Sequence, residues 1–266
     1  MLAHAFQLAG IGAAILAVMM FLICLISLRL HNAGIVDVGW CLGLVILSAW
    51  YAWQGPGSGS RKWIMAAMVT FWGLRLAWHL TRRIASEPED GRYQQIRRDW
   101  QGKNIPLRFL MFFEFQALLD VLLSLPLLLA ALNPDPYLSV LEYAGIGLWF
   151  VAVFGESIAD AQLATFKRDR ANRGKVCQSG LWRYSRHPNY FFEWFTWVAW
   201  MVYALASPWG WLSVACPALM LFFLFRVTGI PATEAQALRS RGEQYSRYQQ
   251  TTSAFVPWFP KSQPAS

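Results

Sequence analysis

The sequence predicts an all-α, polytopic membrane protein with about seven transmembrane helices. Hydrophobic residues make up 56% of its 266 positions and charged residues only 14%, whereas soluble domains carry about 25% charged residues. The apolar residues gather in runs close to the roughly 20 residues that one membrane-spanning helix needs. Lys and Arg concentrate in two of the connections between these runs, which is typical of cytoplasmic loops.

The first three predicted spans cover approximately residues 5–27, 36–53 and 63–80. The first has about the length of a full span and no basic segment before it, so we expect it to be retained rather than cleaved as a signal peptide. A polar connection rich in Gly and Pro, residues 54–62, separates the second span from the third.

Four further spans are predicted at about residues 109–132, 137–163, 188–205 and 211–228. Pro126 should kink the fourth, and residues 133–136 and 207–210 have the composition of tight turns. Residues 229–231, Gly-Ile-Pro, should end or kink the seventh. The tail, residues 229–266, has too few aliphatic residues to cross the membrane again. All the spans are assigned to one transmembrane domain, residues 1–266.

The distribution of positive charge predicts the orientation. The connections 82–108 and 164–187 each hold seven Lys or Arg, and the turns 133–136 and 207–210 hold none. With seven spans, both basic connections and the tail fall on one side, so the N-terminus is expected outside and the C-terminus in the cytosol. Arg61 and Lys62 on the outer side are the exception. The predicted location is the inner membrane of a bacterium or the endoplasmic reticulum of a eukaryote.

Ionisable side chains in the apolar runs are candidates for chemistry, because charge inside a membrane is costly. The alternative for each is a structural ion pair. Glu156 and Asp160 are four residues apart and share a helix face, with Lys167 two turns further on. The complete set is Asp37, Arg75, His79, Glu114, Asp120, Glu156, Asp160, Glu193 and Glu234.

A second group of candidates surrounds the expected start of the sixth span. Pro188 suits the first position of a helix, and Asn189 and Glu193, four apart, then share a face. Free amides at a helix start attract anions, and Arg183 and Arg186 precede it. The aromatic rings of Trp182, Tyr184 and Tyr190 could stack on a ligand ring. The alternative is that these cations and rings meet lipid headgroups.

Several other classes of site are not indicated. The four cysteines lack metal-ligand spacing, so no metal site is expected. Neither the glycine-rich dinucleotide fingerprint nor a phosphate-binding P-loop is present. Nucleic acid is not an expected partner, because membrane spans flank both basic connections.

The motif GLWRYSRHPNYFFEW (residues 180–194), preceded by ADAQLATFKRD (159–169), resembles the signature of the steroid 5α-reductase-like membrane enzymes, in particular their bacterial branch. VDVGW (36–40), WGLRL (72–76), GRY (91–93), GIPATE (229–234) and the tail also resemble that branch. Isoprenylcysteine carboxyl methyltransferases share an Arg-His-Pro-x-Tyr element and a similar tail.

The resemblance implies a seven-helix enzyme that binds NADPH at the cytosolic side and reduces a carbon–carbon double bond conjugated to a 3-ketone. By position, Asp160 would hold the adenosine end, and Asn189 and Glu193 would lie near the nicotinamide carboxamide. The cofactor-closing loops would be residues 82–108 and 164–187. Lys167, Arg168 and Lys175 fall where the family's cations meet the phosphates. The full predicted cofactor site is Arg82, Arg83, Arg92, Asp160, Lys167, Arg168, Lys175, Tyr184, Arg186, His187, Asn189, Glu193 and Glu234.

The ketone-binding residues depart from the family pattern. The animal enzymes use a Gln-Glu pair in the second span and a Tyr in the third, where this chain offers Asp37, Trp40 and His79. Reduction of an enone places negative charge on the carbonyl oxygen, which a hydrogen-bond donor stabilises. A buried carboxyl with a raised pKa could be such a donor, which makes Asp37, Glu193 and Glu234 candidates, and His79 and Tyr190 are the other options. The predicted catalytic residues are Glu193, Asp37, His79 and Tyr190.

The expected substrate is a steroid-like lipid that enters from the bilayer between the first four helices, with membrane lipids as the other partners and no obligate protein partner. The alternatives are an S-adenosylmethionine-dependent methyltransferase of a lipid or prenylcysteine, and a non-catalytic lipid-binding protein. Fourteen Lys and Arg in two loops favour the phosphates of NADPH over the nearly neutral S-adenosylmethionine.

Overall fold

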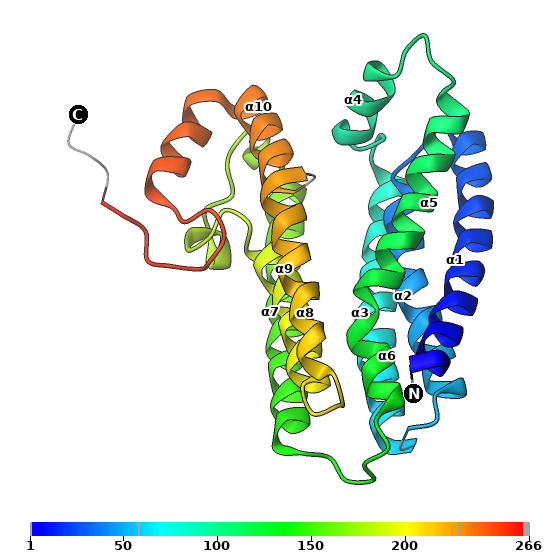
Figure 1. Ribbon diagram of the computed structural model, residues 1–266. Coiled ribbons are helices and arrows are strands. Elements are labelled where there is room, and N and C mark those ends of the chain that lie inside the picture. Colours follow the sequence, from blue (N-terminus) through cyan, green and yellow to red (C-terminus); the bar gives the residue numbers. More distant parts are fainter. Residues whose placement is uncertain (1, 58, 228, 263–266) are drawn as a thin grey trace. The chain divides into compact units, whose positions relative to one another are not determined.

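The computed structural model describes residues 2–57, 59–227 and 229–262, which form helices and loops without a named strand. The chain divides into two compact units (Figure 1). Unit 1 comprises Met1–Tyr143 and Trp200–Cys216, and unit 2 comprises Ala144–Ala199 and Pro217–Ser266. The sequence led us to expect one domain. Because the chain divides into two units, each unit is described by itself.

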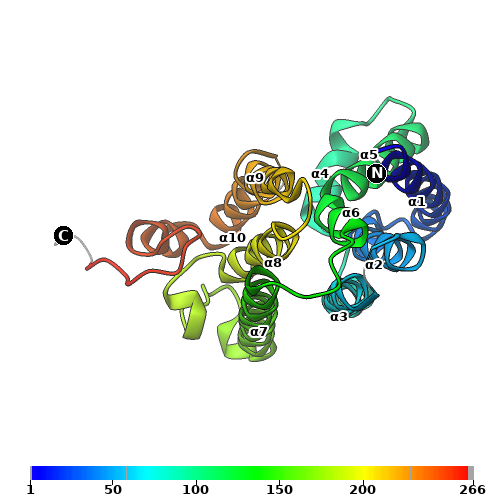
Figure 2. The ribbon, with the colours of Figure 1, turned by 60° about the horizontal axis from the view of Figure 1, so that its bottom comes forward.

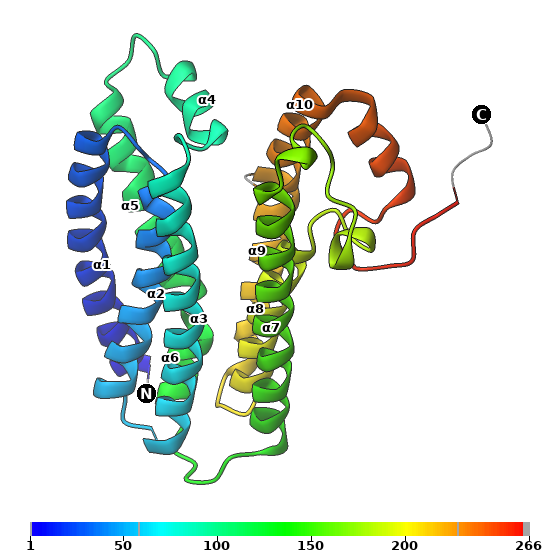
Figure 3. The same ribbon diagram turned by 180° about the vertical axis from the view of Figure 1, so that it is seen from behind.

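Unit 1 is a helical bundle in which α2 (Ile35–Gln54) lies between α1 (Leu2–Leu30) and α3 (Gly59–Ser86), as Figures 2 and 3 show. The short helix α4 (Gly91–Asp99) lies at the end of the bundle away from the N-terminus (Figure 1). It is followed by α5 (Ile105–Leu123) and α6 (Leu125–Leu132). The basic connection 82–108 therefore contains a helix of its own.

The predicted kink in the fourth span is confirmed. Helices α5 and α6 are bent by 40° relative to each other at Ser124, and Pro126 occupies the first turn of α6. Proline cannot donate the backbone hydrogen bond that would continue α5. The Ser124 hydroxyl lies 3.1 Å from the Tyr51 hydroxyl on α2, so a buried polar contact fixes the position of the bend.

The core of unit 1 combines aromatic packing with one buried ion pair. The Trp72 ring is fully buried and meets Trp40 and Trp200 edge to face, with centroids 5.8 and 5.1 Å apart. Arg61 is buried and donates to Glu142, which is also fully buried. Arg61 was an exception to the predicted charge distribution, and this pairing supplies a structural reason for its position.

Unit 2 contains most of α7 (Val140–Arg168) and of α8 (Pro188–Ala204). The connection between them holds two 3-10 turns, η1 (Arg170–Asn172) and η2 (Gly180–Arg183). After a 3-10 turn η3 (Gly210–Val214) in unit 1, the chain continues through α9 (Ala215–Phe222), a π-helical turn η4 (Phe223–Val227) and α10 (Ile230–Thr251). At Gly242 the backbone of α10 is non-helical, with φ 51°, and the helix changes direction there (Figure 1).

Four helical stretches are long and apolar enough to cross a membrane, and the bent pair of α5 and α6 would be a fifth. The protein is thus a multi-pass membrane protein by length and composition, while seven spans and the orientation of the termini stay predictions. The predicted third span lies in α3, which carries five Lys and Arg. The sixth lies in α8, which has 17 residues.

The seventh predicted span falls in the stretch Gly210–Thr251. Its expected end at residue 228 lies outside the described residues, as do residues 263–266 of the tail. Helix α10 contains Arg239, Arg241, Glu243 and Arg247. Because charged residues of this density are excluded from a bilayer, the membrane-spanning part of this stretch precedes α10.

Candidate functional site

The start of α8 lies where the sequence predicted it, at Pro188. The amide of Phe191 donates to the His187 carbonyl at 3.1 Å, which begins the helix. Asn189 in the first turn donates from Nδ2 to Oδ1 of Asp160 on α7 at 3.4 Å. Glu193 follows Asn189 by four residues and is half-buried. Two residues that the resemblance assigned to opposite ends of one cofactor therefore touch.

The turn η2 is fixed to the end of α7 by two hydrogen bonds. The amide of Leu181 donates to Gln162 Oε1 at 2.8 Å, and the indole of Trp182 donates to the Ala159 carbonyl at 2.9 Å. Gly180 adopts φ 59°, and a Cβ at this position would clash with the side-chain amide of Gln162. Glycine alone combines this left-handed backbone with so close an approach.

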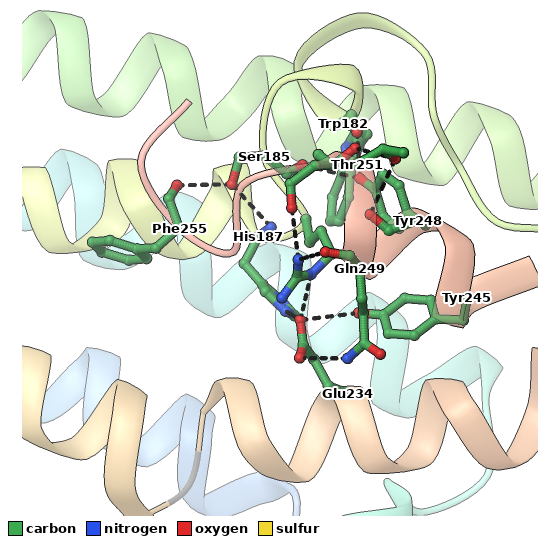
Figure 4. A network of polar contacts seen from close by, with 11 residues as sticks. Trp182, Ser185, His187, Glu234, Tyr245, Tyr248, Gln249, Thr251 and Phe255 are labelled. Carbon is green, nitrogen blue, oxygen red and sulfur yellow. Dashed lines mark hydrogen bonds and ion pairs between the residues drawn. The ribbon is translucent and has the colours of Figure 1, made fainter. Parts of the chain in front are cut away.

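A polar network centred on Glu234 connects the start of α8 with α10 (Figure 4). Glu234 Oε1 accepts from Arg186 Nε at 2.6 Å and lies 3.2 Å from His187 Nε2. Its Oε2 accepts from Gln249 Nε2 at 2.8 Å. The Arg186 Nη1 also donates to the carbonyls of Gln249 and Thr252. Three residues of the predicted cofactor site, Arg186, His187 and Glu234, thus bind one another.

The network determines the charge of Glu234. Burial by itself would raise the pKa of this carboxyl, but hydrogen bonds from His187, Arg186 and Gln249, with the charge of Arg186, outweigh it and lower the pKa to about 2. Glu234 is therefore an ionised acceptor at neutral pH. The hypothesis that it is a neutral carboxyl donor is wrong, because its surroundings supply donors and a positive charge rather than apolar surface.

The C-terminal tail closes over the segment that precedes α8. The Arg186 amide donates to the Ser253 carbonyl at 2.9 Å, and the Ser185 hydroxyl donates to the Phe255 carbonyl at 2.7 Å. The Tyr248 hydroxyl donates to the carbonyls of Trp182 and Ser185. Figure 4 shows these contacts beside the Glu234 network. Residues 182–187 are therefore held from both sides, by α7 and by the tail.

The cations predicted to meet phosphates lie on the surface of unit 2. Lys167 and Arg168 form the last turn of α7, and Lys175 follows in the loop; all three are exposed. The loop backbone is held to α10, since Arg241 Nε donates to the Lys175 carbonyl and the Val176 amide donates to Gln244 Oε1. Exposed charges on a fixed backbone form a suitable surface for an anionic ligand.

The predicted stacking residues contact aromatic rings of the protein. Tyr190 stacks on His187 with centroids 5.3 Å apart and an interplanar angle of 8°. Its hydroxyl lies 3.2 Å from the Thr233 hydroxyl. Tyr184 meets Phe259 of the tail edge to face at 5.9 Å. These contacts orient both tyrosines within unit 2.

Unit 1 contains a second polar cluster, where α4 meets the start of α2. The Tyr93 hydroxyl donates to Asp37 Oδ1 at 2.6 Å, and Arg92 Nη2 lies 3.4 Å from Asp37 Oδ2. Arg92 also donates to both oxygens of Asp90. Burial would raise the pKa of Asp90, but Arg92 and Arg83 lower it below its usual value. Asp37 is thus the acceptor in its contacts with Tyr93 and Arg92.

Glu89 anchors the same cluster to the connection between α1 and α2. Its Oε1 accepts from the Ala33 amide at 2.8 Å and from Arg97 Nη2 at 2.9 Å. His79 lies half-buried near the end of α3, and Arg82 lies over the Trp78 ring at 5.9 Å. Arg83 Nη2 is 3.7 Å from Asp90 Oδ2. The three predicted cofactor arginines of this loop thus lie at one end of unit 1.

The predicted catalytic residues are divided between the units, with Asp37 and His79 in unit 1 and Tyr190 and Glu193 in unit 2. Sequence reasoning gave no role to several residues that the structure places in these clusters. Tyr93 stands in the motif GRY and Gln162 in ADAQ, both of which were noted as resemblances. Gln249 had no such signal. The residues missed in this way are Glu89, Asp90, Tyr93, Gln162, Gln249 and Tyr245, whose hydroxyl donates to Glu234 Oε1 at 3.5 Å.

Comparison with known proteins gives one match. A family described as "Protein of unknown function (DUF1295)" matches residues 21–252, and the match includes both polar clusters. No curated protein and no solved structure matches the chain.

Proposed function

The chain belongs to the DUF1295 family, and we propose that it is a membrane-embedded reductase that uses NADPH to reduce a double bond conjugated to a ketone in a steroid-like lipid. One observation carries the proposal. Asp160 and Asn189, two residues of the predicted cofactor site, are in contact where α7 meets the start of α8. The exposed cations of the α7 end continue from that junction.

The residues present fit a cofactor with several phosphates. Lys167, Arg168 and Lys175 are exposed on one connected segment, and Lys and Arg bind phosphate oxygens through charge-assisted hydrogen bonds. In the proposal these three hold the phosphates, and Asn189 and Glu193 hold the nicotinamide carboxamide with Asp160 directly beside them. The adenosine role that the resemblance implies for Asp160 does not fit this contact. Arg186, His187 and Glu234 contribute by fixing the start of α8 through their mutual contacts.

When bound, NADPH would supply a hydride for the β-carbon of the enone. The protein must then stabilise negative charge on the ketone oxygen and allow one proton to reach the α-carbon, so that two hydrogens add across the double bond. Asp37 already accepts from Tyr93 and Arg92, which makes it an orienting acceptor. The candidates for proton donation are His79, Tyr190 and Glu193.

The direct test uses the purified protein in detergent with NADPH and a 4-en-3-one steroid. The expected result is a loss of nicotinamide absorbance that requires both protein and steroid, with formation of the saturated ketone. Absence of turnover with a panel of steroid and lipid enones, combined with thermal stabilisation by S-adenosylmethionine and not by NADPH, would overturn the proposal in favour of a methyltransferase.

A variant connects the activity to the proposed site. Glu193→Gln should lose turnover or NADPH binding while it retains the elution profile of the folded protein. Glu243→Gln is the matched control, because Glu243 is 78% exposed on α10 and pairs only with Arg247 among the contacts described. Equal activity of the two variants would show that Glu193 has no part in the reaction.

A further inference from the structure

The tail of unit 2 presents a short aromatic segment whose side chains are not covered by the described residues. Val256, Trp258 and Phe259 are 52%, 68% and 75% exposed. Pro257 and Pro260 lie within the same segment and restrict its backbone. Large apolar side chains clustered on one short segment mark a surface that meets another apolar phase.

This segment has a fixed backbone rather than a free end. The Trp258 amide donates to the Tyr184 carbonyl at 2.9 Å, and the Lys261 amide donates to the Thr251 carbonyl at 2.8 Å. Phe255, directly before the segment, is buried. The exposed side chains are therefore held in place by contacts on both sides.

Contacts of Phe255 show that the segment begins beside α8 and η4 of unit 2. The Phe255 ring meets Phe191 and Trp194 in the first turns of α8, with centroids 5.5 and 5.7 Å apart. It also meets Phe225 of η4, directly after α9, at 5.2 Å. The membrane-spanning part of the stretch Gly210–Thr251 precedes α10, so the tail packs where that span ends. Residues 252–262 follow α10 (Figure 1), and Figure 4 shows Phe255 in this segment.

Charge around the segment favours an anionic lipid surface. Arg183 directly precedes Tyr184, whose carbonyl accepts from the Trp258 amide, and Lys261 directly follows the segment; both are exposed. Neither residues 244–262 nor residues 176–192 contain an Asp or Glu. Protein segments that lie at the headgroup level of a membrane typically combine Lys or Arg with exposed Trp and Phe.

We propose that residues 256–260 form an interfacial anchor, which inserts Trp258 and Phe259 into the headgroup region of the bilayer that the protein's own helices cross. Arg183 and Lys261 then contact lipid phosphates. The anchor holds the tail at the membrane surface, and through the tail it holds residues 184–186. This inference is independent of the proposed reductase activity.

The test uses Phe259→Cys in the full-length chain, labelled with an environment-sensitive fluorophore. The four native cysteines are buried, so the new thiol is the accessible one. The protein is reconstituted into vesicles of phosphatidylcholine and phosphatidylglycerol that include a lipid with a nitroxide near the top of its acyl chain. We expect a blue-shifted emission and quenching that is about two-fold or more stronger than at Glu243→Cys, because an inserted residue lies within the headgroup and acyl boundary.

Two outcomes would overturn the anchor. Equal quenching at positions 259 and 243 would mean that the segment stays in water. A blue shift without quenching by the lipid nitroxide would mean that protein, for example a second copy of the chain, covers it. If Phe259→Cys does not elute as a folded protein, Val256→Cys serves in its place, since Val256 is also exposed, and the same comparison with Glu243→Cys applies.

Discussion

Glu234 Oε1 accepts a hydrogen bond from Arg186 Nε at 2.6 Å, and this ion pair joins the first turns of α10 to the residue two positions before α8. Both side chains are largely buried, at 14% and 10% exposure. The same arginine donates to two carbonyls near the end of α10. The pair thereby sets the position of the helix start that carries Asn189 and Glu193.

Replacement of Glu234 by Gln should destabilise the protein. The change removes a charged acceptor that Arg186, His187 and Gln249 share and leaves Arg186 partly buried without a counter-charge, at a cost of about 2 kcal/mol. Thermal unfolding in detergent measures the loss. Glu243→Gln, in the exposed pair with Arg247, is the control and should change stability by about 0.5 kcal/mol or less. Equal midpoints for the two variants would contradict the importance of the network.

The contribution of Glu234 should depend on pH. The pKa of Glu234 in the folded protein is about 2, below the ordinary value of 4.5. The ionised carboxylate therefore stabilises the folded protein fully above about pH 4.5, and this stabilisation is lost as the pH falls towards about 2. The difference in unfolding midpoint between wild type and Glu234→Gln should therefore be constant from pH 7 to about pH 5 and shrink below that. A difference that does not change down to about pH 3 would contradict the lowered pKa.

Gly180→Ala should be more harmful than Gly174→Ala. Both positions have positive φ, 59° and 79°, but only at Gly180 would the new Cβ meet a neighbour, the side-chain amide of Gln162. Both variants incur about 1 kcal/mol of backbone strain, and Gly180→Ala should lose about 1 kcal/mol more as Gln162 moves away from the Leu181 amide. Unfolding midpoints measure both. If the two variants are equally stable, the contact between η2 and α7 has little energetic weight.

Removal of two cations should affect the cofactor rather than the lipid substrate. In a Lys167→Ala, Arg168→Ala double variant we expect the Michaelis constant for NADPH to rise about 100-fold, since each of the two lost charge-assisted hydrogen bonds costs about 1.5 kcal/mol, or a factor of about ten. The constant for the steroid should change little. Arg29→Ala combined with Arg239→Ala removes the same charge from two exposed positions outside both cofactor-closing loops and serves as the control. An unchanged NADPH constant would show that the phosphates bind elsewhere.

Several local features of the fold could be predicted from the sequence, because each depends on covalent geometry or on short-range periodicity. Pro188 begins α8 and Pro126 lies at the bend between α5 and α6, since proline lacks an amide hydrogen and has a fixed φ. Glu156, Asp160 and Lys167 all lie on α7 as expected. The helical, membrane-spanning character follows from composition alone.

The partners of the polar side chains were not predictable in this way. Asp37 was considered as a neutral donor, yet it accepts from Tyr93, which lies 56 residues away in the sequence. Glu234 is one of the other candidates for that role, yet the structure surrounds it with donors from α10 and from the segment before α8. Such pairings depend on which distant segments fold together, and a local sequence pattern does not predict them.

The sequence by itself determined that this protein is an all-helical membrane protein, where α8 begins, and that basic residues gather in two connections. Only the tertiary structure decided which partners the residues around Pro188 contact. It placed Asn189 against Asp160, put Arg186 and Glu234 in an ion pair, and folded the tail over residues 184–186. The physical reason is that hydropathy and proline geometry act within a few residues, whereas a buried charge is satisfied by whichever group the packing of the chain brings to it.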